Sequence, residues 1–394
     1  MIGLFVPYGL MLRAWWRGGR PPSLKAVVLG AAALSMLLLA APPVQSHDVF
    51  QYLFYGRMEI VHGANPYFAP PRKFTSDPWF RTIGWPGRTS VYGPLWTFAV
   101  ARLVAASGSR LLPSLFMAKA LAVGLAGIAV AGLCRLGGPG RDGVGSPPAR
   151  SVAFFALNPL VVTTVALGGH ADAAVAASLI WAMVFDRRNR PLAASLALTA
   201  GSLVKAYAAL PMIVYLFVRS RRSGTAHALK LAAAGVGLAT VAYFPYWRGL
   251  STLRGLVSAG WATSSSLAGL LERGANWALR GAGLAAYAAG AHDLLRVLAA
   301  GVMVAVAVGL ALSPRTLREP WRAALLLLLV FAVVTPWFLP WYLVGPVAVA
   351  AVIEDRALAA LVAAFSGSCL VTASLLGETG QALLRYGSPL AAAG

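Results

Sequence analysis

Long apolar runs separated by short polar turns make up most of the sequence. A helix that crosses a bilayer needs about 20 apolar residues, within a range of about 17–25. Runs near this length cover residues 26–44, 112–133, 151–167, 171–186, 226–244, 293–313, 321–336 and 357–376. The pattern therefore predicts an all-α, multi-pass integral membrane protein.

Two apolar stretches are irregular. Residues 191–218 are interrupted by Lys205 and Pro211, so we expect two short, broken helices that meet near one surface. Residues 340–353 form a further short span. Residues 1–16 lack a charged segment before their apolar stretch and a small-residue cleavage site, so they are expected to be a short or truncated membrane helix and no signal peptide. The expected total is about 11–13 transmembrane helices.

Basic residues gather in the short turns between these runs, as they do on the cytoplasmic side of membrane proteins. The six clusters are Arg13, Arg17, Arg20 and Lys25; Arg135, Arg141 and Arg150; Arg187, Arg188 and Arg190; Arg219, Arg221 and Arg222; Arg315, Arg318 and Arg322; and Arg356. If all six are cytoplasmic, an even number of spans must separate them. The number is even only if residues 93–106 do not cross, so this segment is predicted to be an interfacial helix.

This orientation predicts one membrane domain over residues 1–394 with two long extracytoplasmic segments, 45–111 and 245–292. Both segments are rich in aromatic and polar residues. We find no heptad pattern, solenoid repeat or soluble domain. The expected location is the plasma membrane.

Composition supports this assignment. Hydrophobic residues make up 59% of the chain and charged residues only 11%, against about 25% charged in soluble domains. A solvated globular enzyme and a disordered chain are thereby excluded. The net charge of +21 lies between apolar runs, so we expect a lipid bilayer as partner and no nucleic acid. The two cysteines show no CxxC spacing, which argues against a disulfide framework or a structural zinc site.

A carboxylate follows the first clear span, at Asp48. If residues 47–62 are helical, Asp48, Tyr52, Tyr55 and Glu59 share one face. An acid beside aromatic rings suits sugar handling, because the carboxylate takes a hydroxyl proton while the rings cover the apolar sugar face. The alternative is an interfacial aromatic belt with a solvated aspartate.

A second ionisable group, His170 with Asp172, lies at a helix start. Charge inside a membrane protein is costly and is therefore a functional hypothesis by default. The alternative is an N-cap role for Asp172. His170 and Asp172 alone are too few ligands for a metal site, so none is assigned. Lys205, at the break between two half-helices, either binds an anionic phosphate or extends its charged end to the interface.

Aromatic residues Trp337, Trp341 and Tyr342 flank two prolines at a helix end. They form either an aromatic belt or a wall for a sugar or an isoprenoid chain. Arginines of the outer segments, Arg57 and Arg88 among them, either grip a phosphate or are solvated. No Walker A, GxGxxG, HExxH or GxSxG pattern with its context is present.

Taken in order, several short motifs resemble those of the polyprenyl-phosphate-mannose-dependent mannosyltransferases of the GT-C superfamily. The match is to the actinobacterial α-1,6-mannosyltransferase branch and extends roughly from residue 45 to 345. The motifs are Asp48–Tyr52 with Gly56-Arg57, Gly63–Tyr67, Val91–Leu95, Asn158–Leu160, Gly169–Asp172, Pro336-Trp337 and Pro340–Tyr342.

The resemblance implies a GT-C fold with an extracytoplasmic active site, a polyprenyl-phosphate sugar donor (usually mannose) and a glycan or glycolipid acceptor. It implies that Asp48 is the general base of an inverting transfer and that Asp172 is the acid of the Gly-His-Asn-Asp motif. The further motif residues expected to bind substrate are Tyr52, Arg57, Asn65, Tyr67, Tyr92, His170, Trp337, Trp341 and Tyr342. Lys205, at the helix break, is expected to bind substrate with them. One departure is Ala171, which stands where that motif has asparagine.

Two other functions remain open from the residues alone. A transporter or flippase of a lipid-linked or anionic solute also places charges at broken helices, although it usually shows inverted repeats, and we find none. A non-catalytic membrane subunit needs no acid beside the first span.

Overall fold

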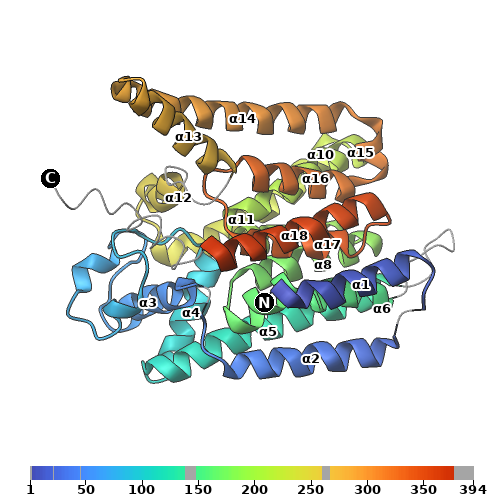
Figure 1. Ribbon diagram of the computed structural model, residues 1–394, viewed down its shortest axis with the longest axis horizontal. Coiled ribbons are helices and arrows are strands. Elements are labelled where there is room, and N and C mark those ends of the chain that lie inside the picture. The colour runs from blue at the N-terminus through green and yellow to red at the C-terminus, as the bar shows by residue number, and fades with distance from the viewer. Residues whose placement is uncertain (1, 21, 45, 138–147, 260–266, 377–394) are drawn as a thin grey trace.

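The computed structural model describes residues 2–20, 22–44, 46–137, 148–259 and 267–376 of the 394-residue chain. Arg141 of the second basic cluster and part of the 245–292 segment lie outside the described residues. Within the described part, helices and turns account for the whole fold (Figure 1). The α-helices are α1 Phe5–Trp16, α2 Leu24–Ala40, α3 Asp48–Ile60, α4 Pro94–Ala106, α5 Leu111–Leu136, α6 Pro148–Ala156, α7 Pro159–Val162, α8 Asp172–Arg187, α9 Pro191–Ser202, α10 Ala209–Ser223, α11 Thr225–Tyr243, α12 Arg254–Ala259, α13 Leu267–Gly281, α14 Ala288–Leu312, α15 Pro314–Arg318, α16 Pro320–Val334, α17 Val344–Ala350 and α18 Arg356–Leu376.

The helices follow the apolar runs closely, and the all-α, multi-pass prediction is confirmed. Among the described residues, three helical segments are long and apolar enough to cross a membrane: Leu111–Leu136, Thr225–Tyr246 and Asp293–Leu312. The bent pair of α6 with Pro159–Leu167 makes a fourth if it is counted as one span. Further apolar helices of 10–17 residues include α2 and α16. The total of about 11–13 spans stays a prediction.

The segment expected as one span at 151–167 is bent by 56°. Pro159 lacks a backbone N–H and disfavours the helical conformation at the residue before it. Asn158 accordingly has extended backbone, and its side-chain oxygen accepts hydrogen bonds from the amides of Leu160 and Val161. Its amide nitrogen donates to the Tyr8 hydroxyl and to Ser366. The Asn-Pro-Leu motif is therefore a capped helix break that connects α1, α7 and α18.

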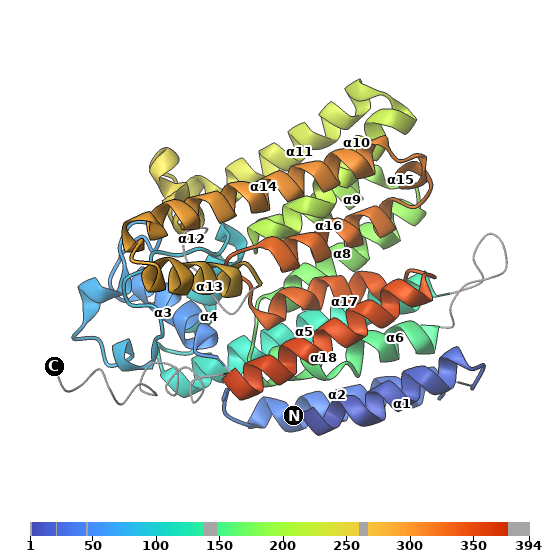
Figure 2. The ribbon, with the colours of Figure 1, turned by 45° about the horizontal axis from the view of Figure 1, so that its top comes forward.

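Helix α8 lies at the centre of the bundle and packs against α5, α9 and α17 (Figure 2). Small residues allow these close contacts. A side chain at Gly132 of α5 would meet Ile180 of α8, and one at Gly201 of α9 would overlap Ser178. Small residues at helix contacts are the usual means of tight association in a bilayer.

The two ends of the bundle differ in character. Helices α3, α4 and α12 lie together at one end, and α15 lies at the other (Figures 1 and 2). Helix α4 packs on α3 so closely that a side chain at Gly56 would collide with the Ala101 backbone. The segment 93–106 thus lies beside α3, and its position at the membrane interface stays a prediction.

Candidate active site

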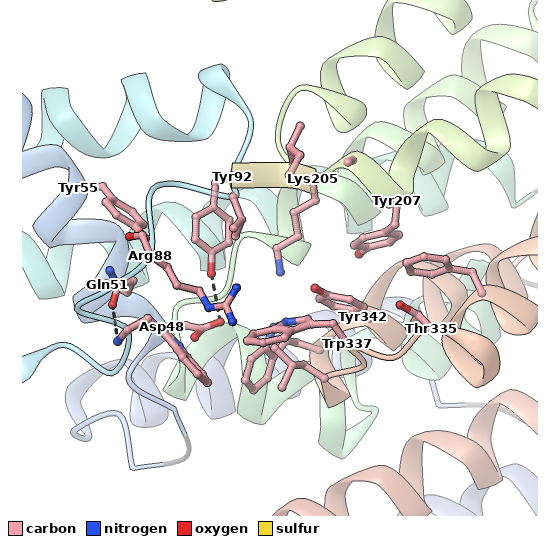
Figure 3. A pocket seen from close by; sticks show the side chains of 17 residues that line it. Asp48, Gln51, Tyr55, Arg88, Tyr92, Lys205, Tyr207, Thr335, Trp337 and Tyr342 are labelled. Carbon is pink, nitrogen blue, oxygen red and sulfur yellow. Dashed lines mark hydrogen bonds between the residues drawn. The ribbon is translucent and has the colours of Figure 1, made fainter. Parts of the chain in front are cut away.

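A cavity of about 250 Å³ opens at the end of the bundle where α3 begins (Figure 3). Its wall combines three charged side chains with many aromatic ones. The lining residues are Asp48, Gln51, Tyr55, Trp85, Arg88, Val91, Tyr92, Lys205, Ala206, Tyr207, Leu256, Phe331, Thr335, Trp337, Leu339, Trp341 and Tyr342. The sequence prediction placed five of these together as site residues besides Asp48: Tyr92, Lys205, Trp337, Trp341 and Tyr342.

Asp48 is the first residue of α3 and is 4% exposed. Its carboxylate oxygen Oδ2 accepts long hydrogen bonds from the hydroxyls of Tyr52 (3.5 Å) and Tyr92 (3.4 Å). Burial raises the pKa of Asp48, while the charge of Lys205 opposes that shift. A buried carboxylate with weak partners and a raised pKa is a stronger base than a solvated one. The alternative of a solvated aspartate is therefore not supported.

Behind Asp48, Tyr52 connects the carboxylate to His170. The Tyr52 hydroxyl lies 3.2 Å from Nδ1 of His170, which is itself 3.9 Å from Oδ2 of Asp48. Because Tyr52 donates to Asp48, the Nδ1–H of His170 donates to Tyr52. The imidazole stacks on the Trp341 ring at 3.9 Å. Tyr52 and His170 thus support Asp48 and Trp341 from outside the cavity lining.

Lys205 lies at the break between α9 and α10, as the sequence predicts, and it is 6% exposed. Its Nζ donates to Oδ2 of Asp172 at 2.6 Å, and the Tyr207 hydroxyl donates to Oδ1 of the same carboxylate at 2.8 Å. The ammonium lies 4.9 Å above the Tyr342 ring and 5.7 Å above the Tyr92 ring. Lys205 does not extend to the interface, since its charged end faces the cavity (Figure 3).

Asp172 is the first residue of α8 and is not its N-cap. The N-cap position of α8 belongs to Ala171, which is fully buried. The partners of Asp172, Lys205 and Tyr207, both come from the break between α9 and α10. Both acids of the predicted site therefore lie at one cavity: Asp48 lines it, and Asp172 pairs with the lysine that lines it.

Gly93 lets the 45–111 segment approach the break between α9 and α10 that contains Lys205. The Gly93 amide donates to the Val204 carbonyl at 2.9 Å, and the Leu95 amide donates to the Leu203 carbonyl at 3.1 Å. A Cβ atom at Gly93 would overlap the Leu203 carbonyl. The Tyr-Gly-Pro-Leu motif therefore needs its glycine for this close approach, which places Tyr92 opposite Lys205.

Aromatic rings form the rest of the wall. Trp85 and Trp337 lie with ring centroids 5.2 Å apart, and the guanidinium carbon of Arg88 lies 5.4 Å above Trp337 (Figure 3). Tyr342 stacks on Tyr207 at 5.0 Å. Aromatic rings beside charged groups are the chemistry expected of a pocket that binds a sugar and an anion.

Besides Tyr52, His170 and Asp172, three further predicted residues do not line the cavity. Arg57 pairs with Asp77, with its Nε 2.7 Å from Oδ2. Burial alone would raise the pKa of Asp77, but hydrogen bonds from the Trp79 amide and from Arg57 are among the contacts that outweigh it and lower the pKa. Asn65 donates to the Tyr246 carbonyl, and Tyr67 donates to the Tyr92 carbonyl, each at 2.9 Å. These contacts fix the two outer segments and the Tyr92 turn.

Several lining residues were not singled out as site residues from the sequence. Gln51 is 1% exposed and follows Asp48 by three residues, so the helical spacing contained this signal. Its Oε1 accepts from the Trp85 amide at 2.9 Å. Trp85 and Tyr207 reach the cavity only through the tertiary fold. In the described part of the chain, no group of three or more His, Cys, Asp or Glu residues is arranged to hold a metal ion.

A family model described as Alpha-(1->6)-mannopyranosyltransferase, N-terminal domain, matches residues 1–220. The chain belongs to this family. It is 27% identical over 392 residues to Alpha-(1->6)-mannopyranosyltransferase A of Mycobacterium tuberculosis (strain ATCC 25618 / H37Rv), an alignment that covers 91% of this chain and 72% of the relative. Membership of the alpha-(1->6)-mannopyranosyltransferase family confirms the resemblance drawn from the motifs and the assignment as a membrane mannosyltransferase. The matched region contains Asp48, Tyr92, Asp172 and Lys205.

Proposed function

We propose that the protein transfers mannose from a polyprenyl-phosphate donor to a glycan or glycolipid acceptor, with inversion, at the extracytoplasmic face of the plasma membrane. The observation that carries the proposal is the cavity itself. A buried carboxylate and two cationic side chains face one space that is otherwise walled by aromatic rings.

In the proposed reaction, Asp48 takes the proton from an acceptor hydroxyl as its oxygen attacks the anomeric carbon. The bond between that carbon and the phosphate oxygen breaks, and the phosphate leaves with the electron pair. General-base assistance of this kind contributes about 10²–10⁴-fold to the rate. The raised pKa of Asp48 supports the assignment because a stronger base accepts the proton more readily.

Lys205 and Arg88 are the proposed partners of the leaving phosphate. A lysine ammonium has three donors, and Asp172 takes one of those of Lys205. Asp172 and Tyr207 orient this side chain before the donor arrives, so little side-chain entropy is lost on binding. Stabilising the charge that develops on the phosphate is the largest contribution expected from such groups.

The aromatic wall supports a sugar as the transferred group. Trp85, Trp337 and Trp341 line the cavity, and the apolar face of a hexose packs against such rings. Tyr52 and His170 contribute by positioning Asp48, while Arg57, Asn65 and Tyr67 contribute by holding the loops.

The experiment is a transfer assay with the purified protein in lipid vesicles. Radiolabelled polyprenyl-phosphate mannose is supplied with a mannan-type acceptor, and labelled GDP-mannose serves as the comparison donor. The proposal predicts label in the acceptor from the lipid donor only. Transfer from GDP-mannose would contradict the donor assignment. Movement of intact labelled lipid across the vesicle with no transfer would favour the flippase alternative.

A further inference from the structure

Helix α13 presents three distinct faces to its surroundings. At 100° per residue, the face that packs against the protein comprises Ala268, Gly269, Glu272, Ala275, Asn276 and Leu279. The residues of this face are buried or half-buried, and α13 packs on α14 and α16. Arg273 and Arg280 lie together along one flank. The remaining sector, about 120° wide, is apolar.

That apolar sector is open to the surroundings. Its large side chains are Leu267 (53% exposed), Leu270 (55%), Leu271 (55%) and Trp277 (81%). A stripe of this size on a helix that already packs with its opposite side is not expected in water, where such patches are rare. The arrangement is typical of helices that lie in the boundary between headgroups and acyl chains, with arginines at the edge of the apolar face.

The neighbouring helix indicates what covers this stripe. Helix α14 follows α13 through the short helix η8 (Ala285–Tyr287), and its membrane-spanning part, Asp293–Leu312, has no buried residue inside the protein. One face of this segment packs on α16, and the rest of its surface must therefore contact lipid. Leu284 and Tyr287 of the connection are 45% and 66% exposed, so the apolar surface is continuous from α14 to α13. Figure 2 shows α13 folded back along α14 at the end near α12.

We propose that α13 docks its apolar face into the acyl chains of the outer leaflet. The segment between residues 267 and 281 then lies in the membrane surface and is not a solvated loop. Helix α12 supplies Leu256 to the cavity, and α16, which α13 contacts, supplies Phe331. Docked in this way, α13 holds the wall of the cavity at the lipid surface.

The test uses the full chain in vesicles of phosphatidylcholine and phosphatidylglycerol. Cys134 and Cys369 are replaced by serine, and a single spin label is attached at Leu271→Cys, with Leu267→Cys as a second site. Collisions of the label with oxygen, which concentrates in lipid, are compared with collisions with a water-soluble nickel chelate. The matched control is Arg280→Cys on the flank of the same helix.

The proposal predicts an oxygen-to-nickel accessibility ratio above one at both leucine sites and below one at Arg280→Cys. Ratios below one at the leucine sites would overturn it, because the stripe would then face water. Low accessibility to both reagents would also overturn it, because a second protein surface would then cover the stripe. Both readouts are independent of sugar transfer, so this result and that of the transfer assay are separable.

Discussion

The contact between Gly93 and the Lys205 break predicts a large effect from adding one carbon. In Gly93→Ala, the new Cβ would overlap the Leu203 carbonyl and would lie 3.0 Å from its Cα. The backbone on both sides must move, and the hydrogen bonds from Gly93 to Val204 and from Leu95 to Leu203 are lost or stretched.

The magnitude follows from two contributions. Two backbone hydrogen bonds are worth about 0.5–1.5 kcal/mol each, and overpacking at a tight contact costs about 1–3 kcal/mol. The sum is a loss of about 2–6 kcal/mol in the free energy of unfolding. Because Tyr92 and Lys205 face each other at 5.7 Å across this contact, kcat/KM should fall as well.

The assay is thermal unfolding in detergent together with sugar transfer in vesicles. The matched control is Gly124→Ala in α5, where a Cβ meets nothing within 4 Å and the helix gains a better helix former. We expect a lower Tm and lower activity for Gly93→Ala and neither change for Gly124→Ala. Equal Tm and activity for the two variants would refute the reasoning.

Two further predictions address buried lysines. Asp48 must be ionised to act as a base, so activity is lost as pH falls through its pKa. Because the charge of Lys205 lowers that pKa, Lys205→Met should move the acidic limb of the pH–rate profile to higher pH. An acidic limb at unchanged pH would contradict the coupling of Asp48 to Lys205. Lys119 of α5 donates to the Leu38, Leu39 and Ala41 carbonyls at the end of α2. Lys119→Met should cost about 2–4 kcal/mol of unfolding free energy because these acceptors lose a charged donor. The control is Lys230→Met at an exposed position, which should cost under about 0.5 kcal/mol. Thermal unfolding of both variants measures the difference.

Local patterns in the sequence predicted much of the fold. The apolar runs located the helices because a bilayer requires long apolar segments. Helix spacing predicted one face with Asp48, Tyr52, Tyr55 and Glu59. The first three side chains are buried in the structure, and Glu59 is half-buried. Lys205 and the proline after it predicted the break between α9 and α10, because neither residue suits the interior of an apolar helix.

Contacts between distant segments could not be read from these patterns. The pairing of Asp172 with Lys205 joins residues 33 apart, and the approach of Gly93 to Leu203 joins segments more than 100 residues apart. Pro159 indicated the bend at Asn158, but the apolar run around it has the length of one span and was interpreted as one. Arg57, Asn65 and Tyr67 have the residue types of a binding site, and only their partners show that they hold loops.

The most direct measurement concerns Asp48, because the proposed reaction depends on its carboxylate as the proton acceptor. Asparagine keeps the size of the side chain and its contacts with Tyr52 and Tyr92 but removes the base. In single-turnover transfer from radiolabelled polyprenyl-phosphate mannose, Asp48→Asn should be slower by about 10²–10⁴-fold, while donor binding and Tm stay close to those of the unmodified protein. Transfer by Asp48→Asn at the unmodified rate would contradict the account.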